Sequence, residues 1–235
     1  MINGYHLYHY KELSSTNLEA IQMAKKGALD GTIVLADVQS SGRGRHGKDW
    51  ISPKGNLYAS IIIRDKTNVT QLTHFTFITA VAVGNTLLAL SANLDLKYKW
   101  PNDILVNNKK IAGILLETEA NASWLVIGIG INILSSPEYA VSLSQVCNLN
   151  ISNLTLLKEL INNFDRIRQR WLSEGFLSIR KMWLERAYMV DSSINIKIGS
   201  NLYSGIFSDI DQEGRIVIST HDNNLISLES GEVFY

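Results

Sequence analysis

The sequence has too few cysteines for a disulfide scaffold and no excess of charge of either sign. Cys147 is the one cysteine among 235 residues, so no disulfide can form within the chain, and this fits a reducing cytosol. Basic and acidic side chains both number 22, which gives zero net charge. Proteins that bind nucleic acid normally carry a wide positive field. The charge balance therefore argues against that class.

Patterns of secretion and membrane insertion are also missing from the sequence. Residues 1–6 do not show the basic and then apolar order of a signal peptide. Residues 68–93 contain no Asp, Glu, Lys or Arg, yet polar residues interrupt them, so they make a poor membrane span. We expect a buried helix over about 72–90 instead. The chain is therefore predicted to be a soluble cytoplasmic protein with no membrane partner.

Local patterns predict an α+β arrangement. A helix is expected to begin at 15–19, where Thr16 and Glu19 have the spacing of a capping box, and Gly27 is expected to end it. The apolar face of this helix would consist of Leu18, Ile21 and Ala24. Strands are predicted over 33–38, 57–63, 94–100, 104–106, 111–117 and 125–132. Two further helices are predicted over about 154–171 and 179–183.

The last part of the chain has a different pattern. After Asp191 the sequence turns to short alternating segments separated by turn residues, such as 211–214 and 230–231. Roughly 45 residues of this kind predict a small all-β module, a barrel of the SH3 type. The expected organisation is an α+β domain over 1–190 and a β domain over 191–235.

A loop rich in glycine and arginine is the most informative segment. Residues 42–48 read Gly-Arg-Gly-Arg-His-Gly-Lys, which is too charged to pack and too rich in glycine for a stable helix or strand. Backbone N–H groups and guanidinium groups in such a mobile loop can close over an anion. A basic surface turn and an arginine–glycine patch for nucleic acid are the alternative interpretations.

Three more polar clusters interrupt apolar elements, and each has a structural alternative. Residues 15–17, Ser-Thr-Asn, are usual helix caps. Residues 101–103, Pro-Asn-Asp, are typical of a turn. Lys110 in the segment 110–117 is equally consistent with a solvated hairpin lysine. In the strand 125–132, Gly128 and Gly130 mark a place where another group approaches the backbone closely.

Together, in this order and spacing, the clusters resemble those of the biotin protein ligases, also called biotin–[acetyl-CoA-carboxylase] ligases. The matching stretches are 15–17, Gln39 with 42–47, 99–103, 110–117 and 128–132. The resemblance runs from about Leu13 to the end of the chain. It implies a mixed or antiparallel sheet flanked by helices, as in class II synthetases, forming a catalytic biotin- and ATP-binding domain over 1–190. An SH3-like β barrel would follow over 191–235.

The chain departs from the family pattern in two places. Only about a dozen residues precede the first motif, too few for the DNA-binding helix-turn-helix domain of some members. We therefore expect the form without that domain, and no nucleic acid as a partner. His46 and Lys48 stand where some members have arginines, which keeps a charge at Lys48 but removes a bidentate donor.

The resemblance implies a two-step reaction. The biotin carboxylate attacks the α-phosphate of MgATP to give biotinyl-5′-AMP and diphosphate. A lysine of a biotin carboxyl carrier domain then attacks this mixed anhydride, and AMP leaves. ATP with Mg²⁺ and biotin are the implied ligands, and the carrier domain of a biotin-dependent carboxylase is the acceptor. Mg²⁺ would use mostly phosphate and water oxygens, so no metal-ligating residue is assigned.

The same resemblance assigns residues to each part of the site. Biotin-binding residues would be Ser15, Thr16, Asn17, Gln39, Arg43, Gly44, Arg45, Lys110 and Gly113. Residues on the ATP and adenylate side would be Arg43, Arg45, Lys48, Trp50, Asn102, Asp103, Lys110 and Asn132. Catalytic roles fall to Lys110, between the biotin carboxylate and the α-phosphate, and to Arg45, which would fold over the acyl-phosphate.

The same features of the sequence argue against other functions. A lipoate ligase shares the broad fold and adenylate chemistry, but lipoyl has no ureido head for the triplet 15–17 and Gln39 to bind. A nucleic-acid-binding protein conflicts with the zero net charge. A biotin-storage protein would not need Lys110 and Asp103, and the Met-Lys-Met acceptor sequence of a carrier is absent. A homodimer through the edge of a sheet at 128–132 is an expectation that no pattern demonstrates.

Overall fold

The computed structural model describes residues 1–64, 69–120, 123–147, 149, 151–222 and 224–234. Its first part contains the elements β1 His6–Leu13, α1 Thr16–Lys25, β2 Thr32–Gln39, η1 Arg45–Gly47, β3 Leu57–Ile63, α2 Val69–Leu72, α3 His74–Leu90, β4 Leu96–Lys99, β5 Asp103–Val106, β6 Lys109–Thr118 and β7 Leu125–Ile131. These are followed by α4 Leu143–Cys147, α5 Asn153–Glu174, α6 Phe176–Leu184, β8 Ser193–Ile198, β9 Asn201–Ile210, β10 Ile216–Ser219, β11 Leu225–Leu228 and β12 Glu232–Phe234.

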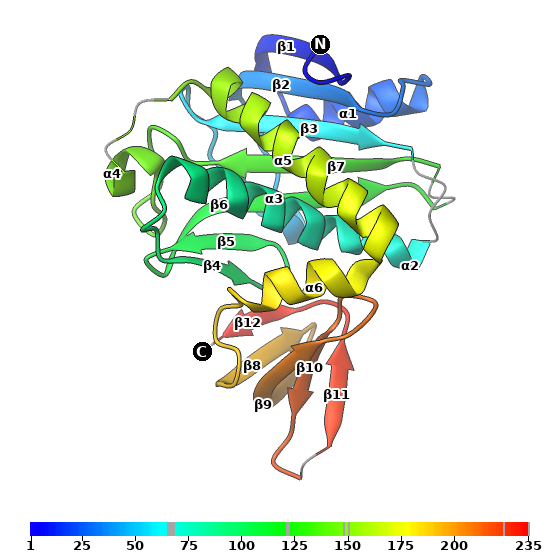
Figure 1. Ribbon diagram of the computed structural model, residues 1–235, viewed down its shortest axis with the longest axis vertical. Coiled ribbons are helices and arrows are strands. Elements are labelled where there is room, and N and C mark those ends of the chain that lie inside the picture. Colours follow the sequence, from blue (N-terminus) through cyan, green and yellow to red (C-terminus); the bar gives the residue numbers. More distant parts are fainter. Residues whose placement is uncertain (65–68, 121–122, 148, 150, 223, 235) are drawn as a thin grey trace.

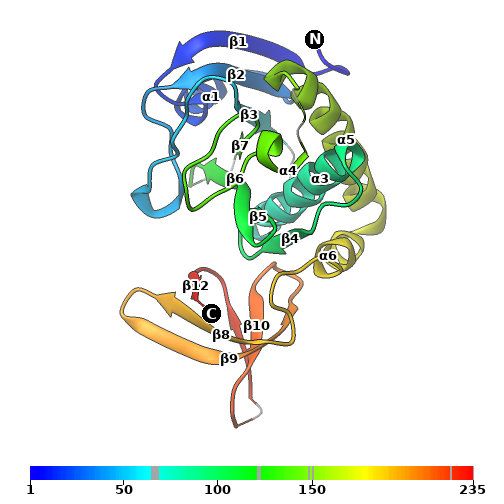
Figure 2. The same ribbon diagram turned by 90° about the vertical axis from the view of Figure 1, so that its left-hand side faces the viewer.

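The predicted α+β class is confirmed by two sheets. A seven-stranded mixed sheet has the strand order β1-β2-β3-β7-β6-β5-β4, in which β1 and β2 are parallel and the other neighbours antiparallel. Figure 1 shows α3 and α5 across one face of this sheet, with α1 behind it. A five-stranded antiparallel sheet, β11-β10-β9-β8-β12, lies beyond α6 (Figures 1 and 2).

Side-chain alternation along the central strands divides the interior into two parts. In β2, Ile33 and Leu35 face the large core formed with α3 and α5, whereas Val34 faces the smaller core under α1. The segment expected as a buried helix over 72–90 is α3. This helix is apolar on all sides because it lies between the sheet and α5. No helix among the described residues is long and apolar enough to cross a membrane.

The start of α1 corrects one prediction. The helix begins at Thr16, one residue earlier than a Thr16–Glu19 capping box requires, and the Thr16 hydroxyl donates to Gln39 instead. Ser15 holds the N-cap position without a side-chain cap bond. The predicted apolar face is also wrong at Leu18, which is exposed. The helix packs on the sheet through its small residues Ala20 and Ala24, which allow close approach.

Other predicted elements agree with the structure, and some elements were not predicted. Gly27 has the expected positive φ, of 88°, and the hairpin between β5 and β6 turns at Asn107 and Asn108, both with positive φ. The strand β1 and the short helix α4 had no clear periodic pattern. The strand β7 pairs with β3 on one side and β6 on the other, so a dimer through its edge at 128–132 is excluded.

The second sheet is fastened to the first part of the chain at one turn. Three side chains donate to consecutive carbonyls of the β9–β10 turn: His74 Nε2 to Gln212 (2.8 Å), Thr73 Oγ1 to Glu213 (2.8 Å) and Trp100 Nε1 to Gly214 (3.1 Å). Trp100 directly precedes the polar cluster 101–103, which contains the predicted site residues Asn102 and Asp103, so this turn helps to hold that cluster in place.

His74 must be neutral in this junction. The indole N–H of Trp171 can only donate, so His74 Nδ1 accepts this hydrogen bond, at 3.3 Å. The ring hydrogen of His74 is therefore on Nε2, which donates to the carbonyl of Gln212. Phe176 stacks on the imidazole with a centroid distance of 3.9 Å. Burial lowers the pKa of His74 from its ordinary value of 6.5, against the opposing effect of the Gln212 hydrogen bond and of Glu213.

Acidification is therefore expected to weaken this junction. Because the folded pKa lies below the unfolded value, the unfolded chain takes up the proton first, and stability is lost as the pH falls below about 6.5. Each unit of depression corresponds to about 1.4 kcal/mol. Urea unfolding between pH 7.5 and 5 should show a steeper decline for the parent protein than for His74→Gln. Exposed His221→Gln serves as the control, and equal slopes for His74→Gln and the parent protein would refute the assignment.

Candidate active site

A cavity of about 290 Å³ lies on the face of the seven-stranded sheet opposite α3 and α5. All residues that the sequence assigned to a site line it, namely Ser15, Thr16, Asn17, Gln39, Arg43, Gly44, Arg45, Lys48, Trp50, Asn102, Asp103, Lys110, Gly113 and Asn132. Its walls come from the start of α1, the loop between β2 and β3, the strands β6 and β7, and the segment 137–140. Four polar clusters far apart in sequence therefore meet in one place.

Glycines on β7 form the floor of this cavity. Along the strand the isoleucines at 127, 129 and 131 enter the core, so Gly128 and Gly130 face the cavity. A Cβ atom on Gly128 would lie 2.2 Å from Asn17 Oδ1, and one on Gly130 would lie 2.5 Å from Trp50 Cε2. The close approach predicted from the sequence is thus made by two side chains of the site itself.

One end of the cavity is a hydrogen-bonded cluster of neutral side chains. Gln39 Oε1 accepts from the backbone N–H and the hydroxyl of Thr16 at 2.8 and 3.1 Å. Ser60 Oγ lies 2.8 Å from Thr16 Oγ1 and 2.6 Å from Asn17 Oδ1. Ser60 has one hydroxyl hydrogen for these two oxygens, so at least one of them remains able to accept a hydrogen bond from a ligand.

Ser60 was missed by the sequence interpretation. It is fully buried in β3, and the available signal was a small polar side chain within the largely apolar run Leu57–Ile63. A buried hydroxyl on a central strand needs a hydrogen-bond partner. Its partners at 16 and 17 come from another element, however, and only the fold reveals them.

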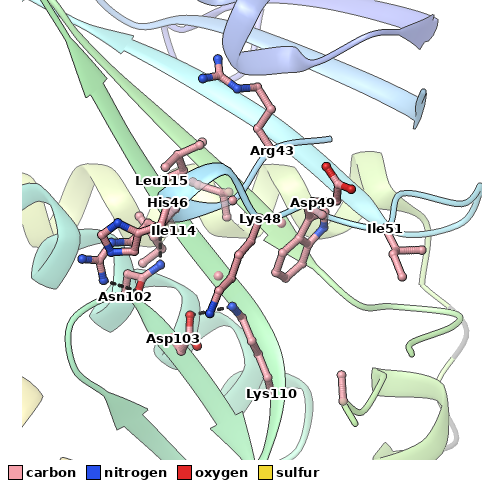
Figure 3. Close-up of a pocket in the computed structure, with 18 of the residues that line it drawn as sticks. Arg43, His46, Lys48, Asp49, Ile51, Asn102, Asp103, Lys110, Ile114 and Leu115 are labelled. Atoms are coloured by element: carbon pink, nitrogen blue, oxygen red, sulfur yellow. Dashed lines mark hydrogen bonds and ion pairs between the residues drawn. The ribbon is translucent and has the colours of Figure 1, made fainter. Parts of the chain in front are cut away.

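The opposite end of the cavity is cationic. Lys110 Nζ lies 2.7 Å from Asp103 Oδ1 and 5.1 Å from the centre of the Trp50 ring. Arg45 donates to Asn102 Oδ1 at 3.2 Å, and Asn102 in turn donates to the carbonyl of Ile114 at 2.8 Å. Figure 3 shows Asp103 and Lys110 pointing toward each other in this part of the cavity. The ion pair and the amide fix the two cations in place.

Burial changes the ionisation of this cationic end. It lowers the pKa of Lys99 and of Arg45, while the nearby carboxylate of Asp103 acts in the opposite direction on both. Lys110 also lowers the pKa of Lys99 by like-charge repulsion. Lys48, Lys99, Lys110 and Arg45 face the two carboxylates of Asp103 and Glu232, so positive charge is in excess and the arrangement favours an anionic ligand.

A β-bulge explains why Lys110 faces the cavity. Leu105 pairs with Lys110 and Ile104 pairs with Ala112, so Ile111 is an extra residue in β6. Ile111 and Ala112 both enter the core, whereas strict alternation would have placed Lys110 there together with Ala112. The bulge thus moves the lysine to the side of the anion site.

The glycine–arginine loop is folded over the cavity. Gly44 N–H donates to the carbonyl of Lys48 at 2.7 Å, and a single 3₁₀ turn covers Arg45–Gly47, with positive φ at His46 and Gly47. No longer helix or strand forms between β2 and β3, as the composition predicted. Whether the loop is mobile stays a prediction.

The C-terminal strand contributes to the cavity, which the sequence did not predict. Residues 231–233 line it, and the Glu232 carboxylate forms an ion pair with Lys48 of the glycine–arginine loop. This contact holds the pKa of Glu232 below its ordinary value. The two residues are 184 positions apart, so local patterns carry no trace of their pairing.

The cavity thus combines an acceptor-rich neutral end with a cationic end. It suits a ligand with N–H donors at one end and a negative group at the other. Among the described residues no group of three or more His, Cys, Asp or Glu side chains could hold a metal ion.

Known proteins are similar to this chain in sequence and in fold. Residues 11–133 match the biotin/lipoate A/B protein ligase family. The chain is 31% identical to the biotin–[acetyl-CoA-carboxylase] ligase of Paracoccus denitrificans, over 94% of this chain and 97% of that protein. It is 31% identical to the bifunctional ligase/repressor BirA of Bacillus subtilis, over 94% of this chain and 71% of that protein. The fold is similar to that of a biotin protein ligase from Aquifex aeolicus in complex with biotin and ATP, with a TM-score of 0.84, 24% identity and 97% of each chain covered.

Proposed function

This chain belongs to the biotin/lipoate A/B protein ligase family, and from that premise we propose which of its residues act on each substrate. The chain is a biotin–[acetyl-CoA-carboxylase] ligase, which activates biotin with ATP to biotinyl-5′-AMP and transfers the biotinyl group to a protein. The observation that carries the assignment of residues is the cavity with one neutral, acceptor-rich end and one cationic end.

The neutral end receives the ureido head of biotin. That head offers two N–H donors and one carbonyl acceptor. The side-chain oxygens of Thr16 and Asn17 line this end and can accept from N–H groups, while the buried Ser60 behind them and Gln39 hold these two side chains in place. A lipoyl group has no N–H donors, so it would leave these buried oxygens without partners, which costs free energy. This donor–acceptor match favours biotin over lipoate.

The cationic end brings two anions together. The biotin carboxylate must approach the α-phosphate of ATP, and two unit charges at contact distance repel by roughly 4 kcal/mol at reduced dielectric. Lys110 lies on the cavity side of the bulge and can sit between them, with Asp103 holding its ammonium group. Arg45 and Lys99 add positive charge where the oxygens of the transition state become more negative.

The remaining residues of the predicted adenylate side surround this centre. Trp50 lies over the glycine floor and beside Lys110, and Asn132 donates to the carbonyl of Val141, which shapes the wall that carries Tyr139. We assign the nucleotide to this side of the cavity, together with Lys48 and Asn102. Mg²⁺ would be held by the phosphate oxygens of ATP and would neutralise part of their charge.

The second step transfers biotin to a lysine of a carrier domain. The loop 42–48 lies over the cavity and would exclude water from the mixed anhydride until the acceptor amine arrives. We propose that residues 1–190 form the catalytic domain. The second unit, 191–235, would support it through the β9–β10 turn and the pair of Lys48 with Glu232.

Exchange of radiolabelled diphosphate into ATP tests this function without the unknown acceptor. The protein should catalyse exchange with biotin, and at least a hundredfold less with lipoate at equal concentration, because a site built for N–H donors rejects a ligand that lacks them. Omission of Mg²⁺ should abolish exchange. Exchange that is independent of biotin, or faster with lipoate, would refute the proposal.

A further inference from the structure

We propose that Glu117 is a positioning residue that couples the end of the cavity that binds the biotin head to the glycine–arginine loop. Its two carboxylate oxygens have different partners: Oε2 accepts from Asn17 Nδ2 at 2.8 Å, and Oε1 lies 3.1 Å from Arg43 NH1. Glu117 itself does not line the cavity. The inference rests on the proposed function, because it concerns how that site holds biotin and its adenylate.

The first contact sets which way the Asn17 amide points. Its NH₂ group donates to Glu117 and, at 3.4 Å, to the carbonyl of Leu115, so its oxygen faces Ser60 and the floor at Gly128. If the amide turned over, an N–H donor would face the donors of the biotin head. An acceptor at position 117 therefore makes this end of the cavity selective for a ligand with N–H groups.

The second contact gives the two arginines of the loop, Arg43 and Arg45, different partners and different roles. The guanidinium of Arg43 pairs with Glu117. Figure 3 shows Arg43 pointing away from Asp103 and Lys110. Arg45, two residues further on, reaches Asn102 at the cationic end. Arg43 is thus neutralised by Glu117 and fastens the base of the loop to β6, while Arg45 supplies charge to the adenylate.

One carboxylate consequently connects substrate recognition with loop closure. A biotin head that binds Asn17 Oδ1 favours the amide orientation that Glu117 accepts, and the ordered Glu117 is then fixed for Arg43. The converse holds as well, since coupling between two contacts is reciprocal. A closed loop should therefore slow the release of biotinyl-AMP through this residue.

A double-mutant cycle tests the coupling in the whole protein. Glu117→Gln keeps an oxygen for Asn17 but loses the charge that pairs with Arg43. It should leave the KM for biotin within about twofold and raise the dissociation rate of biotinyl-AMP about fivefold, the size expected for a partly exposed ion pair. Arg43→Gln should raise that rate by the same factor, and the double variant should be no worse than either single one.

Glu117→Leu removes both contacts and should also raise the KM for biotin about tenfold, with the KM for ATP unchanged. Glu119→Gln, which makes the same charge change two residues later outside the cavity, is the matched control and should behave like the parent protein. Thermal unfolding of each variant reports its folding. Should Glu117→Leu not fold, the cycle with Glu117→Gln still decides the matter.

Three results would overturn the inference. Additive effects of Glu117→Gln and Arg43→Gln on dissociation would show that the two residues act separately. A change of melting temperature alone, with both KM values and the dissociation rate unaltered, would make Glu117 merely structural. A parent protein without biotin-dependent diphosphate exchange would remove the proposed function itself, which distinguishes that failure from the other two.

Discussion

Lys110→Gln is expected to lose adenylate formation by several orders of magnitude while the protein remains folded. The lysine lies at the cationic end of the cavity, 2.7 Å from Asp103, where we place the meeting of the biotin carboxylate and the α-phosphate. A cation at that point stabilises the transition state far more than the separate substrates, since only there do two anions come into contact. Glutamine keeps a polar but shorter side chain and removes the charge.

The fold should survive this change because the Lys110 side chain is partly exposed and faces the cavity, not the core. Biotin-dependent diphosphate exchange measures the loss, and circular dichroism with thermal unfolding checks the structure. Lys109→Gln is the matched control: the neighbouring lysine in β6 is exposed, outside the cavity, and should exchange normally. A folded Lys110→Gln variant with near-normal exchange would remove Lys110 from the catalytic site.

Arg45→Gly is expected to release the adenylate intermediate and so to label unrelated proteins. Arg45 is mostly buried in the cavity and is held by Asn102 at 3.2 Å, within the loop that covers the cationic end. Its guanidinium can form a charge-assisted pair with the phosphate of biotinyl-5′-AMP, which makes closure of the loop favourable once the intermediate exists. Glycine removes that pair and adds backbone freedom, so the variant should retain the intermediate less well than it forms it.

Freed biotinyl-5′-AMP is a reactive mixed anhydride that acylates exposed lysines. Incubation of the variant with biotin, ATP and a bystander protein without an acceptor domain, followed by a blot for biotin, should therefore show labelling well above that of the parent protein. Lys54→Gly, an exposed substitution in the same β2–β3 connection but outside the cavity, is the control. An unlabelled bystander combined with unchanged dissociation of the adenylate would mean that the loop is not a lid.

The two variants test different parts of one site and should fail in different ways. Lys110→Gln should lose the chemical step, so diphosphate exchange falls and no intermediate escapes. Arg45→Gly should keep most of the exchange and lose retention. If both variants lost exchange equally, the division between a central lysine and a covering arginine would be wrong, although the location of the site would stand.

Much of the fold could be predicted because its signals are local. The strands 57–63 and 125–131 show continuous apolar residues, and the segment 72–90 lacks charge because α3 lies between the sheet and α5. The start of α1 shows the limit of such signals. The spacing of Thr16 and Glu19 suits a capping box, but the Thr16 hydroxyl is used by Gln39, a residue on another element.

In the site, too, some features follow from local sequence patterns and others only from contacts between distant segments. Composition alone marked the loop 42–48 as a segment for anions, and the order of the four clusters carried the resemblance to a family. The cavity brought every one of those residues together. The structure also revealed the contacts of Ser60, Glu232 and Glu117, which no local pattern indicated because each depends on a partner far along the chain.

The sequence by itself determined most of the strands and helices, where glycine permits close approach, and which residue types could meet an anion. Those properties depend on side-chain size, charge and alternation over a few neighbours. The tertiary structure alone decided which groups touch. The order β3-β7-β6 sets Asn17 against Glu117 across 100 residues, and one bulge at Ile111 turns Lys110 from the core to the cavity. Strand order and register are properties of the whole sheet, fixed by the packing of distant segments, so no window of the sequence contains them.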